Sequence, residues 1–276
     1  MTRDRAGELD TTLTQLARLP ERPPILVVDN ASTDGTAGMV ASRHPDVTLI
    51  QAARNLGAAG RNVGVRRAPT TYVAFSDDDS WWEPGALQRA AAAFDANPTL
   101  GLVAARILVG RDERTDPTSL AMARSPLPAD PTLPGVPVLG FLACGAVVRR
   151  SAFLDVGGFE PRLEMGGEEH LLALDLARRG YRLRYLDEVV AHHHPSTHRD
   201  TGERRRQLTR NAVWTAWLRR PPSVAGRVTL RAIARSRHDE HAAAGLRQSL
   251  AGLGWVLRER EVVDPTVEDS LRTLGL

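Results

Sequence analysis

Apolar runs of strand character alternate along this chain with segments whose leucines and alanines recur at helical spacing. The strand-like runs are ILVVD ending at Asp29, VTLI at 47–50, YVAF at 72–75, LGLVAARILV at 100–109, LACGAVVRR at 142–150 and YRLRYL at 181–186. The helical patterns cover 9–19, a segment through Met39, one after Gly57, 87–94, one near Phe153, and 168–179. Such alternation is typical of βα units, so the pattern predicts an α/β fold with a mixed, mostly parallel sheet flanked by helices.

Two segments break this alternation. Residues 112–137 are rich in proline and polar side chains, which predicts a long mobile loop of the kind that carries function. Beyond His198 the pattern is helical to the end. We therefore expect an α/β domain over residues 1–200 and a C-terminal helical extension over 201–276.

Composition narrows the class of protein. The 276 residues are 42% hydrophobic, an ordinary value for a globular protein. All 36 basic residues are arginine, so a pI near 9.7 accompanies a net charge of only +3. These arginines are interleaved with acidic residues along the sequence, which argues against a nucleic-acid partner.

The expected location of the protein is the cytoplasm. The single cysteine, Cys144, excludes an intrachain disulfide and is typical of a reducing compartment. No apolar run reaches membrane-spanning length, and the N-terminus has no signal-peptide pattern. Contact with the inner face of a membrane is compatible with these features.

The segment YVAFSDDDSWWEPGAL, residues 72–87, is the most informative in the chain. Three consecutive carboxylates at the end of a strand repel one another unless a cation lies among them. Oxygen ligands at this edge of an α/β sheet suit Mg²⁺ or Mn²⁺, which also bind phosphate. The alternative is a solvated turn in which Asp79 or Ser80 caps the helix entered at Pro84.

Four further segments carry candidate chemistry. They are VVDNASTDGT at 27–36, RNLGAAGRNVG at 54–64, GGFEPRLEMGGEEHLLALDLARRGYRLRY at 157–185 and AHHHPSTH at 191–198. Together with the Asp run, and in this order, they resemble the family 2 glycosyltransferases, an inverting group with the GT-A fold. The resemblance covers roughly residues 2–220 and implies a nucleotide-diphospho-sugar transferase that depends on Mg²⁺ or Mn²⁺.

The resemblance implies roles for several polar residues in binding a nucleotide sugar. Asp29 would accept a hydrogen bond from the base, and Asn30 and Ser32 would shape the turn. In the glycine-containing loop, Arg61 with Asn62 would meet the diphosphate. Asn55, Asp77 and Asp78 complete the expected donor site. The alternative for the first turn is structural, because Asp, Asn, Ser and Thr are also the ordinary residues of βα turns and N-caps.

The resemblance also implies a metal site. Asp77 and Asp79 match the DxD motif of the family, and Asp79 is the first choice for direct coordination. His192 or His193 fits the position of a histidine ligand that follows a strand, while His194 is adjacent. A purely structural role for these histidines is the alternative.

The catalytic base is expected at the start of the helix over 168–179. The family has Gly-Glu-Asp here, whose aspartate takes the proton of the acceptor hydroxyl, whereas this chain has Gly167, Glu168 and Glu169. The base therefore falls on Glu169, with Glu168 as the other candidate. An acidic first turn that favours the helix dipole is the structural alternative.

The N-terminus departs from the family pattern. Members begin with a buried strand of the form VSVVIPTYNR, whereas MTRDR at 1–5 matches only the tail of that motif. We expect either that the natural start lies upstream, which we favour, or that the sheet lacks a central strand. Both alternatives predict a gap lined by apolar groups of ILVVD and YVAF.

The helical segment QLTRNAVWTAWLRRPP, residues 207–222, places Trp214, Trp217 and Leu218 on one face among arginines. Packing against the catalytic domain is the favoured interpretation. Peripheral contact with an anionic membrane is the alternative, which would suit a lipid-linked acceptor. Glycans and small molecules are the other acceptors considered.

Two other functions remain open from the sequence. A sugar nucleotidyltransferase shares an α/β nucleotide domain and an acidic metal site, but the N-terminal region has no glycine-rich, basic triphosphate loop. A non-catalytic sugar-nucleotide binder would follow from loss of the first strand. Donor hydrolysis would distinguish an enzyme from a binder.

Overall fold

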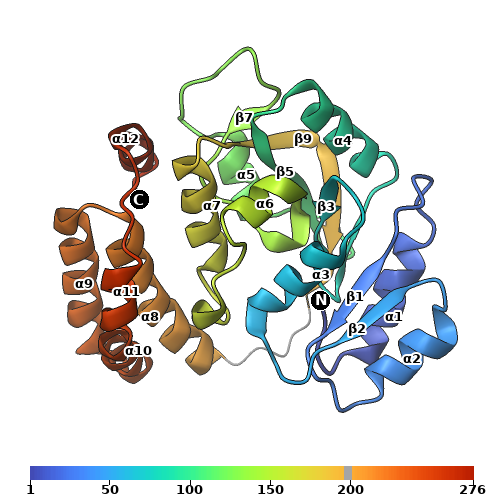
Figure 1. The fold of residues 1–276 in the computed structure, drawn as a ribbon, viewed down its shortest axis with the longest axis horizontal. Coiled ribbons are helices and arrows are strands. Elements are labelled where there is room, and N and C mark those ends of the chain that lie inside the picture. Colours follow the sequence, from blue (N-terminus) through green and yellow to red (C-terminus); the bar gives the residue numbers. More distant parts are fainter. Residues whose placement is uncertain (196–200) are drawn as a thin grey trace.

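The computed structural model describes residues 1–195 and 201–276, and its main feature is one mixed sheet (Figure 1). The sheet has the strand order β3-β8-β5-β9-β4, with β6 paired to β5 and β7 to β9. Its strands are β3 (Tyr72–Ala74), β4 (Ser80–Trp82), β5 (Leu100–Val109), β6 (Arg114–Thr115), β7 (Val136–Pro137), β8 (Ala146–Arg149) and β9 (Arg182–His193). A separate two-stranded parallel sheet contains β1 (Leu26–Asp29) and β2 (Thr48–Gln51).

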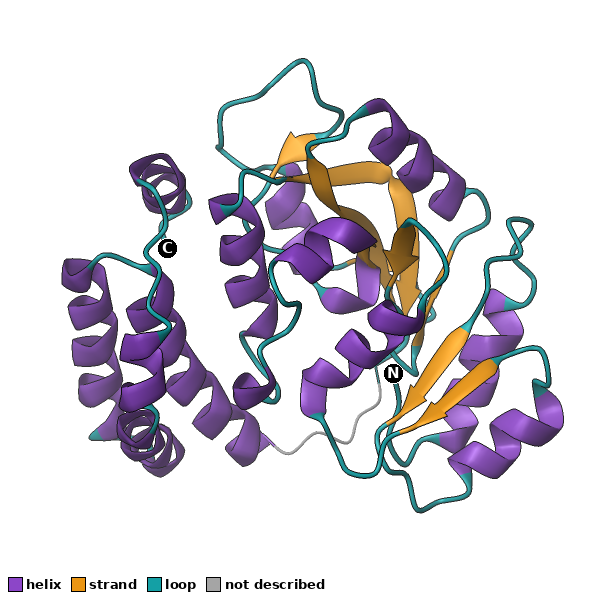
Figure 2. Cartoon of the chain, viewed as in Figure 1, coloured by secondary structure: helices purple, strands orange, loops and turns teal. Residues whose placement is uncertain are grey.

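Helices cover both faces of the main sheet, and the C-terminal part is helical throughout (Figure 2). The helices of the sheet-bearing part are α1 (Ala6–Leu16), α2 (Thr36–Arg43), α3 (Gly60–Arg67), α4 (Ala86–Ala96), α5 (Pro117–Ala123), α6 (Arg150–Asp155) and α7 (Glu168–Arg178). The C-terminal helices are α8 (Thr201–Arg219), α9 (Pro222–Ser236), α10 (Glu240–Ala251), α11 (Leu253–Arg258) and α12 (Pro265–Thr273). This arrangement confirms the predicted α/β fold with a helical appendage.

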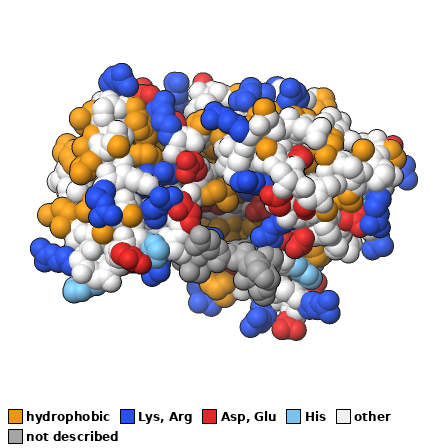
Figure 3. All heavy atoms as spheres, turned by 90° about the horizontal axis from the view of Figure 1, so that it is seen from below, with side chains coloured by type: hydrophobic (Ala, Val, Ile, Leu, Met, Phe, Trp, Pro, Cys, Tyr) orange, Lys and Arg blue, Asp and Glu red, His pale blue; other side chains and the backbone are white. Residues whose placement is uncertain are grey.

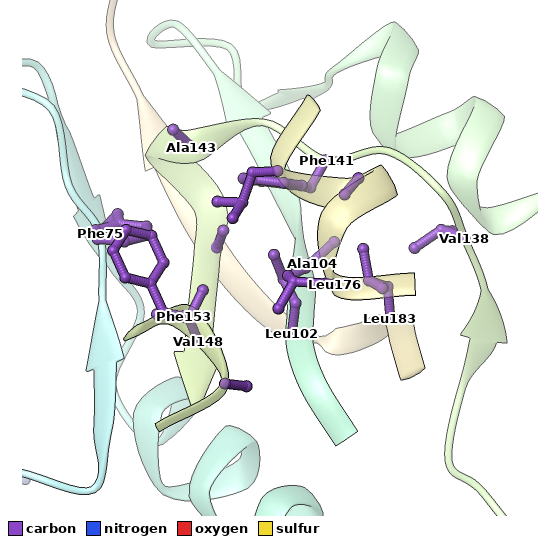
Figure 4. Close-up of a cluster of buried hydrophobic side chains, with 14 of the residues drawn as sticks. Phe75, Leu102, Ala104, Val138, Phe141, Ala143, Val148, Phe153, Leu176 and Leu183 are labelled. Atoms are coloured by element: carbon purple, nitrogen blue, oxygen red, sulfur yellow. The ribbon is translucent and has the colours of Figure 1, made fainter. Parts of the chain in front are cut away.

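Strand β5 forms the centre of the core because both of its faces are buried. Leu102 and Ala104 point to one face, where they pack with side chains of α6 and α7 (Figure 4). Val103 and Ala105 point to the other face, where α4 contributes Phe94. Alternation of side chains along a strand therefore explains why this run is continuously apolar rather than amphipathic.

The sheet is mixed, as expected, but parallel pairs are fewer than the pattern indicated. Within the described ranges, ladders run parallel only between β1 and β2 and between β5 and β9. Strand β8 pairs antiparallel with both β3 and β5. The apolar runs predicted burial correctly, but burial on two faces does not encode strand direction.

The prediction of a continuous loop over 112–137 is wrong. This segment contains β6, the helix α5 and β7. The helix begins after Asp116, whose Oδ1 accepts a hydrogen bond from the Thr118 amide at 2.7 Å, and Pro117 occupies its first position. Proline at the first helical position and an aspartate cap are favourable starts for a helix, so the proline marked a helix boundary here.

An apolar cavity of about 560 Å³ separates β1 from β3. Its lining includes Val27 and Val28 of β1 and Val73 of β3, with Leu13 from α1. The two strands belong to different sheets and do not pair with each other. The predicted gap between the ILVVD and YVAF segments is therefore confirmed.

The N-terminal residues lie at the end of this cavity. Thr2 forms a parallel bridge with Asp29, donating its amide to Val28 O at 3.0 Å and accepting from the Asn30 amide at 2.9 Å. On the other side, the Met1 amino group donates to Ser76 O at 3.1 Å. These two residues therefore bridge β1 and the end of β3 where the cavity stops.

The C-terminal helices gather at one end of the molecule and pack against α7 through α8 (Figure 1). Trp214 and Leu218 are buried beside Leu171 of α7, and Val256 of α11 closes the cluster. The predicted packing of this helix face against the sheet-bearing part is therefore confirmed. Among the described residues, no helix has the length and apolarity to cross a bilayer.

Candidate active site

The pairing of β4 with β9 brings the Asp run to the histidine segment. Ser80 lies opposite His193 and Trp81 lies opposite His192 in an antiparallel register. The backbone of the Asp run extends this contact, because the His194 amide donates to Asp79 O at 2.8 Å. The histidines thus lie at the end of β9 itself rather than after it, a correction to the expected position.

Asp79 and His193 form the closest pair of candidate metal ligands. His193 Nε2 lies 3.3 Å from Asp79 Oδ1, and both side chains are largely buried. His192 points elsewhere, with Nδ1 3.3 Å from Glu113 Oε1, and its ring stacks on Trp81. Of the two histidines proposed for the metal, the geometry favours His193.

Asp77 is paired with Arg61 of α3. The Arg61 guanidinium donates through Nη2 to Asp77 Oδ1, while its Nε and Nη1 atoms are buried without a hydrogen-bond partner among the described residues. Burial would raise the pKa of Asp77, but the adjacent guanidinium outweighs burial and holds it below its ordinary value. Asp77 is therefore a carboxylate held in ionised form within the protein.

Asp78 faces a different cation. Its Oδ1 lies 3.9 Å from Arg5 Nε, and Arg5 Nη1 lies 3.8 Å from Asp79 Oδ2. Burial raises the pKa of Asp78 to about 6, although Arg5 favours the charged form. Arg5 was not among the residues predicted for the site, because an arginine just before a helix carries no distinguishing signal in the sequence.

Neither Asp79 nor Ser80 caps the helix that follows the Asp run, so the capping alternative is wrong. Helix α4 begins at Ala86 after Gly85, which adopts a left-handed conformation at φ 82° and provides no side-chain cap. Ser80 Oγ instead accepts a hydrogen bond from the Asp77 amide at 2.7 Å. The serine thus tightens the turn that holds the carboxylates together.

Glu168 and Glu169 begin α7 and lie close enough to Arg61 for their charges to act on it. Glu169 Oε1 accepts a hydrogen bond from the Ala143 amide at 3.4 Å, and Glu168 Oε2 is buried without a hydrogen-bond partner in the part of the chain that the structure describes. Burial and then the negative charge of Glu168 raise the pKa of Glu169 to about 7. Burial also raises the pKa of Glu168. A carboxylate with a pKa near neutral pH suits a general base.

Two glycines and one asparagine hold the start of α7. Gly166 and Gly167 both have φ near +90°, at 88° and 89°, a conformation that favours glycine. Asn211 of α8 donates through Nδ2 to Gly166 O at 2.7 Å and to Leu163 O at 2.8 Å. No local sequence pattern indicates this role of Asn211, because its partners are backbone carbonyls far away along the chain.

The glycine-containing loop of residues 54–64 lies against the loop before α7. The Ala58 amide donates to Glu164 O at 2.7 Å. A Cβ at Gly57 would lie 2.6 Å from the same oxygen, so a larger residue does not fit there. Asn55 Oδ1 accepts from the Gly57 amide at 2.9 Å and fixes the turn. This contact joins the two loops expected to meet donor and acceptor.

The remaining predicted donor residues hold backbone turns in the structure. Asp29 Oδ1 accepts from the Ser32 amide at 2.9 Å, and Ser32 Oγ accepts from the Asp4 amide at 2.9 Å. Asn30 Nδ2 donates to Gly57 O at 3.1 Å. Asn62 exchanges two hydrogen bonds with the Phe159 backbone, at 2.7 and 2.9 Å, so its amide is engaged by the protein itself.

The residues brought together fit a divalent cation that is shared with a diphosphate. Asp79 and His193 offer a carboxylate and an imidazole, a donor set that suits Mn²⁺. Within residues 1–195 and 201–276, no group of three His, Cys, Asp or Glu side chains is arranged to hold a metal. Phosphate oxygens supply the missing ligands in many Mg²⁺ and Mn²⁺ sites, so the fit depends on the donor.

Figure 3 shows a hollow between the sheet-bearing part and the C-terminal helices, with acidic side chains beside it. Asp77 precedes β4 and Glu169 belongs to α7, and both lie close enough to Arg61 for their charges to act on it. The fold thus brings the Asp run, the start of α7 and a buried arginine near one another.

Comparisons with known proteins agree with this geometry. The family model described as glycosyl transferase family 2 matches residues 1–157. The pre-mycofactocin glycosyltransferase of Mycobacterium tuberculosis (strain CDC 1551 / Oshkosh) is 33% identical over 214 residues, covering 72% of this chain and 42% of the relative. The chain thus spans less than half the length of that relative.

Two further proteins are similar. The N-acetylglucosaminyl-diphospho-decaprenol L-rhamnosyltransferase of the same organism is 29% identical over 227 residues, covering 70% of this chain and 74% of the relative. The mannosyltransferase PcManGT from Pyrobaculum calidifontis, solved with GDP-Man and Mn²⁺, superposes with a TM-score of 0.60 at 23% identity, covering 99% of this chain and 73% of that one. The chain therefore has the GT-A fold and belongs to glycosyl transferase family 2.

Proposed function

We propose that this protein is a metal-dependent inverting glycosyltransferase that moves a sugar from a nucleoside diphosphate sugar to an acceptor hydroxyl. One observation carries the proposal. Glu169, whose pKa is raised to about 7, and Asp77 of the Asp run both lie close enough to Arg61 for their charges to act on its guanidinium. A base and a cation-binding group near one another are what a single displacement requires.

Glu169 takes the proton of the acceptor hydroxyl as that oxygen forms a bond to the anomeric carbon of the donor. The bond between the anomeric carbon and the diphosphate oxygen breaks in the same step, and the electron pair leaves with the diphosphate. Attack from the face opposite the leaving group inverts the anomeric configuration. Arg61 stabilises the negative charge on the diphosphate side, because two of its guanidinium nitrogens have no hydrogen-bond partner within residues 1–195 and 201–276.

Asp79 and His193 would hold a Mg²⁺ or Mn²⁺ ion, with Asp77 adjacent. When bound, the ion would act as a Lewis acid that stabilises the negative charge on the leaving nucleoside diphosphate. Arg5 lies against Asp78 and Asp79 and relieves carboxylate repulsion in the absence of the ion. Asp29 and Ser32 shape the turn that meets the base of the nucleotide, and Asn30 ties it to the glycine-containing loop.

The acceptor is proposed to be lipid-linked, because a relative of similar length is named for a diphospho-decaprenol substrate. Residues 1–200 are proposed as the catalytic domain and 201–276 as a helical extension. The extension contributes to catalysis indirectly, since Asn211 holds the loop that precedes Glu168. The catalytic domain acts in the cytoplasm, where the acceptor would be met at the membrane surface.

The test is a panel of nucleoside diphosphate sugars measured by calorimetry with and without Mn²⁺, followed by assay of donor turnover. We expect one donor to bind far more tightly with the metal than without it, and to be consumed when acceptor is added. Hydrolysis of the donor without acceptor also indicates an enzyme. Metal-dependent binding with no turnover of any donor would instead indicate a sugar-nucleotide binder.

A further inference from the structure

The charge of this protein is distributed unevenly. Residues 201–276 contain 14 arginines and 8 acidic side chains, a net charge of +6, although the whole chain has a net charge of only +3. The remaining residues therefore carry a net charge of −3. A basic surface on the C-terminal helices thus lies beside an acidic catalytic part.

Helix α9 (Pro222–Ser236) carries positive charge without any negative side chain. Four exposed arginines, and no carboxylate, occur from residue 222 to residue 238; they are Arg227, Arg231, Arg235 and Arg237. None of the four forms an ion pair within the described part of the chain. The first carboxylate that follows, Asp239, caps α10 and lies 3.5 Å from Arg205.

Apolar side chains are interspersed with these arginines. Leu230 is 66% exposed and Ile233 is 39% exposed; Leu230 lies one turn from both Arg227 and Ile233, and Arg231 lies one turn from Arg227. The opposite face of α9 packs against the rest of the protein, because Val224 and Ala232 are buried there. Thr229 Oγ1 accepts a hydrogen bond from Trp217 of α8 at 3.0 Å, which fixes the orientation of the helix.

We propose that the outer face of α9, formed by Arg227, Leu230, Arg231 and Ile233, docks on an anionic lipid bilayer. The arginines neutralise lipid headgroups, and the two aliphatic side chains enter the boundary between headgroups and acyl chains. This surface differs from the helix face with Trp214 and Leu218, which is buried in the protein. The C-terminal helices also show hydrophobic side chains next to basic ones in the space-filling view (Figure 3).

A bilayer fits this face better than a nucleic acid does. Arginines alone serve either polyanion, but exposed leucine and isoleucine side chains gain nothing against a phosphate backbone. They gain free energy on entering an apolar boundary. This docking extends the proposed function, because it places a transferase beside a lipid-linked acceptor.

The test uses the full chain and sedimentation with vesicles of phosphatidylcholine containing phosphatidylglycerol, compared with vesicles of phosphatidylcholine alone. We expect binding to the anionic vesicles that weakens as salt is raised. Arg227→Gln with Arg231→Gln should lower the partition coefficient by roughly 25-fold, about fivefold for each charge. Leu230→Ser with Ile233→Ser should lower it at least about tenfold at unchanged charge.

Matched controls lie on the catalytic part. Arg111→Gln with Arg124→Gln removes two exposed charges, and Leu120→Ser removes an aliphatic side chain that is 43% exposed. We expect neither to change vesicle binding by more than about twofold, because these residues follow β5 or belong to and follow α5, outside the proposed α9 face. Circular dichroism and thermal melting would verify that every variant is folded.

Three results would overturn the proposal. They are absence of binding to anionic vesicles, equal losses in the control variants, and binding to duplex DNA with the same arginine dependence and no dependence on Leu230 or Ile233. Vesicle binding is measured without donor or metal, so its failure leaves the proposed transferase activity intact. Conversely, vesicle binding by a protein that turns over no donor would refute only the proposed function.

Discussion

Asp79 Oδ1 and His193 Nε2 lie 3.3 Å apart, although one residue ends the Asp run and the other ends the long strand β9. The antiparallel register of β4 with β9 produces this contact, since Ser80 pairs with His193. A shift of that register by one residue would bring His192 to the carboxylate instead. The proposed metal site is therefore a product of strand pairing and not of sequence proximity.

Replacement of Asp79 by alanine is expected to abolish metal-dependent donor binding while the fold survives. Loss of one carboxylate relieves repulsion within the Asp run, so thermal stability without metal should not fall by more than a few degrees. His193→Ala should weaken Mn²⁺-dependent binding by roughly 10- to 100-fold. Calorimetric titration of donor in Mn²⁺ measures both effects.

His192→Ala is the matched control, because His192 contacts the exposed Glu113 and lies off the proposed site. Its donor affinity in Mn²⁺ should stay within about threefold of the parent protein. A larger loss at His192 than at His193 would reverse the assignment. Unchanged affinity after Asp79→Ala would remove the Asp run from metal binding.

Glu169→Gln should reduce turnover by roughly two to four orders of magnitude with little effect on donor binding, as expected for a lost general base. Glu168→Gln should cost much less, and Glu169→Asp should retain partial activity with a shorter reach. Glu240→Gln, at a fully exposed glutamate, is the surface control. A greater loss at Glu168 would transfer the role of base to that residue, and no loss at either would exclude this helix from the chemistry.

Turnover is expected to rise with pH through about 7, because Glu169 acts in its ionised form and burial raises its pKa to that value. The negative charge of Glu168 also raises the pKa of Glu169. Glu168→Gln should therefore lower the pKa of Glu169 and move the rising limb of the pH–rate profile to lower pH. The two carboxyls titrate as a pair, so the profile reports apparent values of the pair. Initial rates measured between about pH 5 and 9 test this prediction. It would be contradicted if the rising limb of the profile lay at the same pH in the Glu168→Gln variant as in the parent protein.

Arg61→Gln should destabilise the protein by roughly 1 to 3 kcal/mol, because it leaves the half-buried Asp77 carboxylate without its cation. The double variant with Asp77→Asn should recover a substantial part of that loss, since the uncompensated charge is then absent. Urea unfolding of the two single variants and the double variant measures the coupling. Additive losses would show that the ion pair does not stabilise the fold.

An extended apolar segment of about five residues joined before Met1 should raise the unfolding temperature. Thr2 already pairs with β1 in parallel, so such a segment would run into the apolar cavity between β1 and β3 and could pair with both strands. A segment of the same length made of serine and glycine is the control. Equal unfolding temperatures for the two fusions would mean that the cavity does not accept a strand.

The sequence by itself determined the order of the elements and the residues that end them. Burial requires apolar runs of recognisable length, so the strands β1, β2, β5 and β8 were located to within a few residues from ILVVD, VTLI, LGLVAARILV and LACGAVVRR alone. The Asp run, the glycine-containing loop and the two glutamates were recognised because their chemistry is local. The gap beside β1 was also predictable, because MTRDR matched only the end of a strand motif.

Tertiary structure decided how these segments meet. Strand direction around β8, the choice of His193 over His192, and the support given by Arg5 and Asn211 all depend on contacts between residues distant in sequence. The raised pKa of Glu169 has the same origin, because burial and the charge of a neighbour exist only in the folded chain. Apolar periodicity encodes which side chains are buried, but register and electrostatics arise from packing, which a local pattern does not contain.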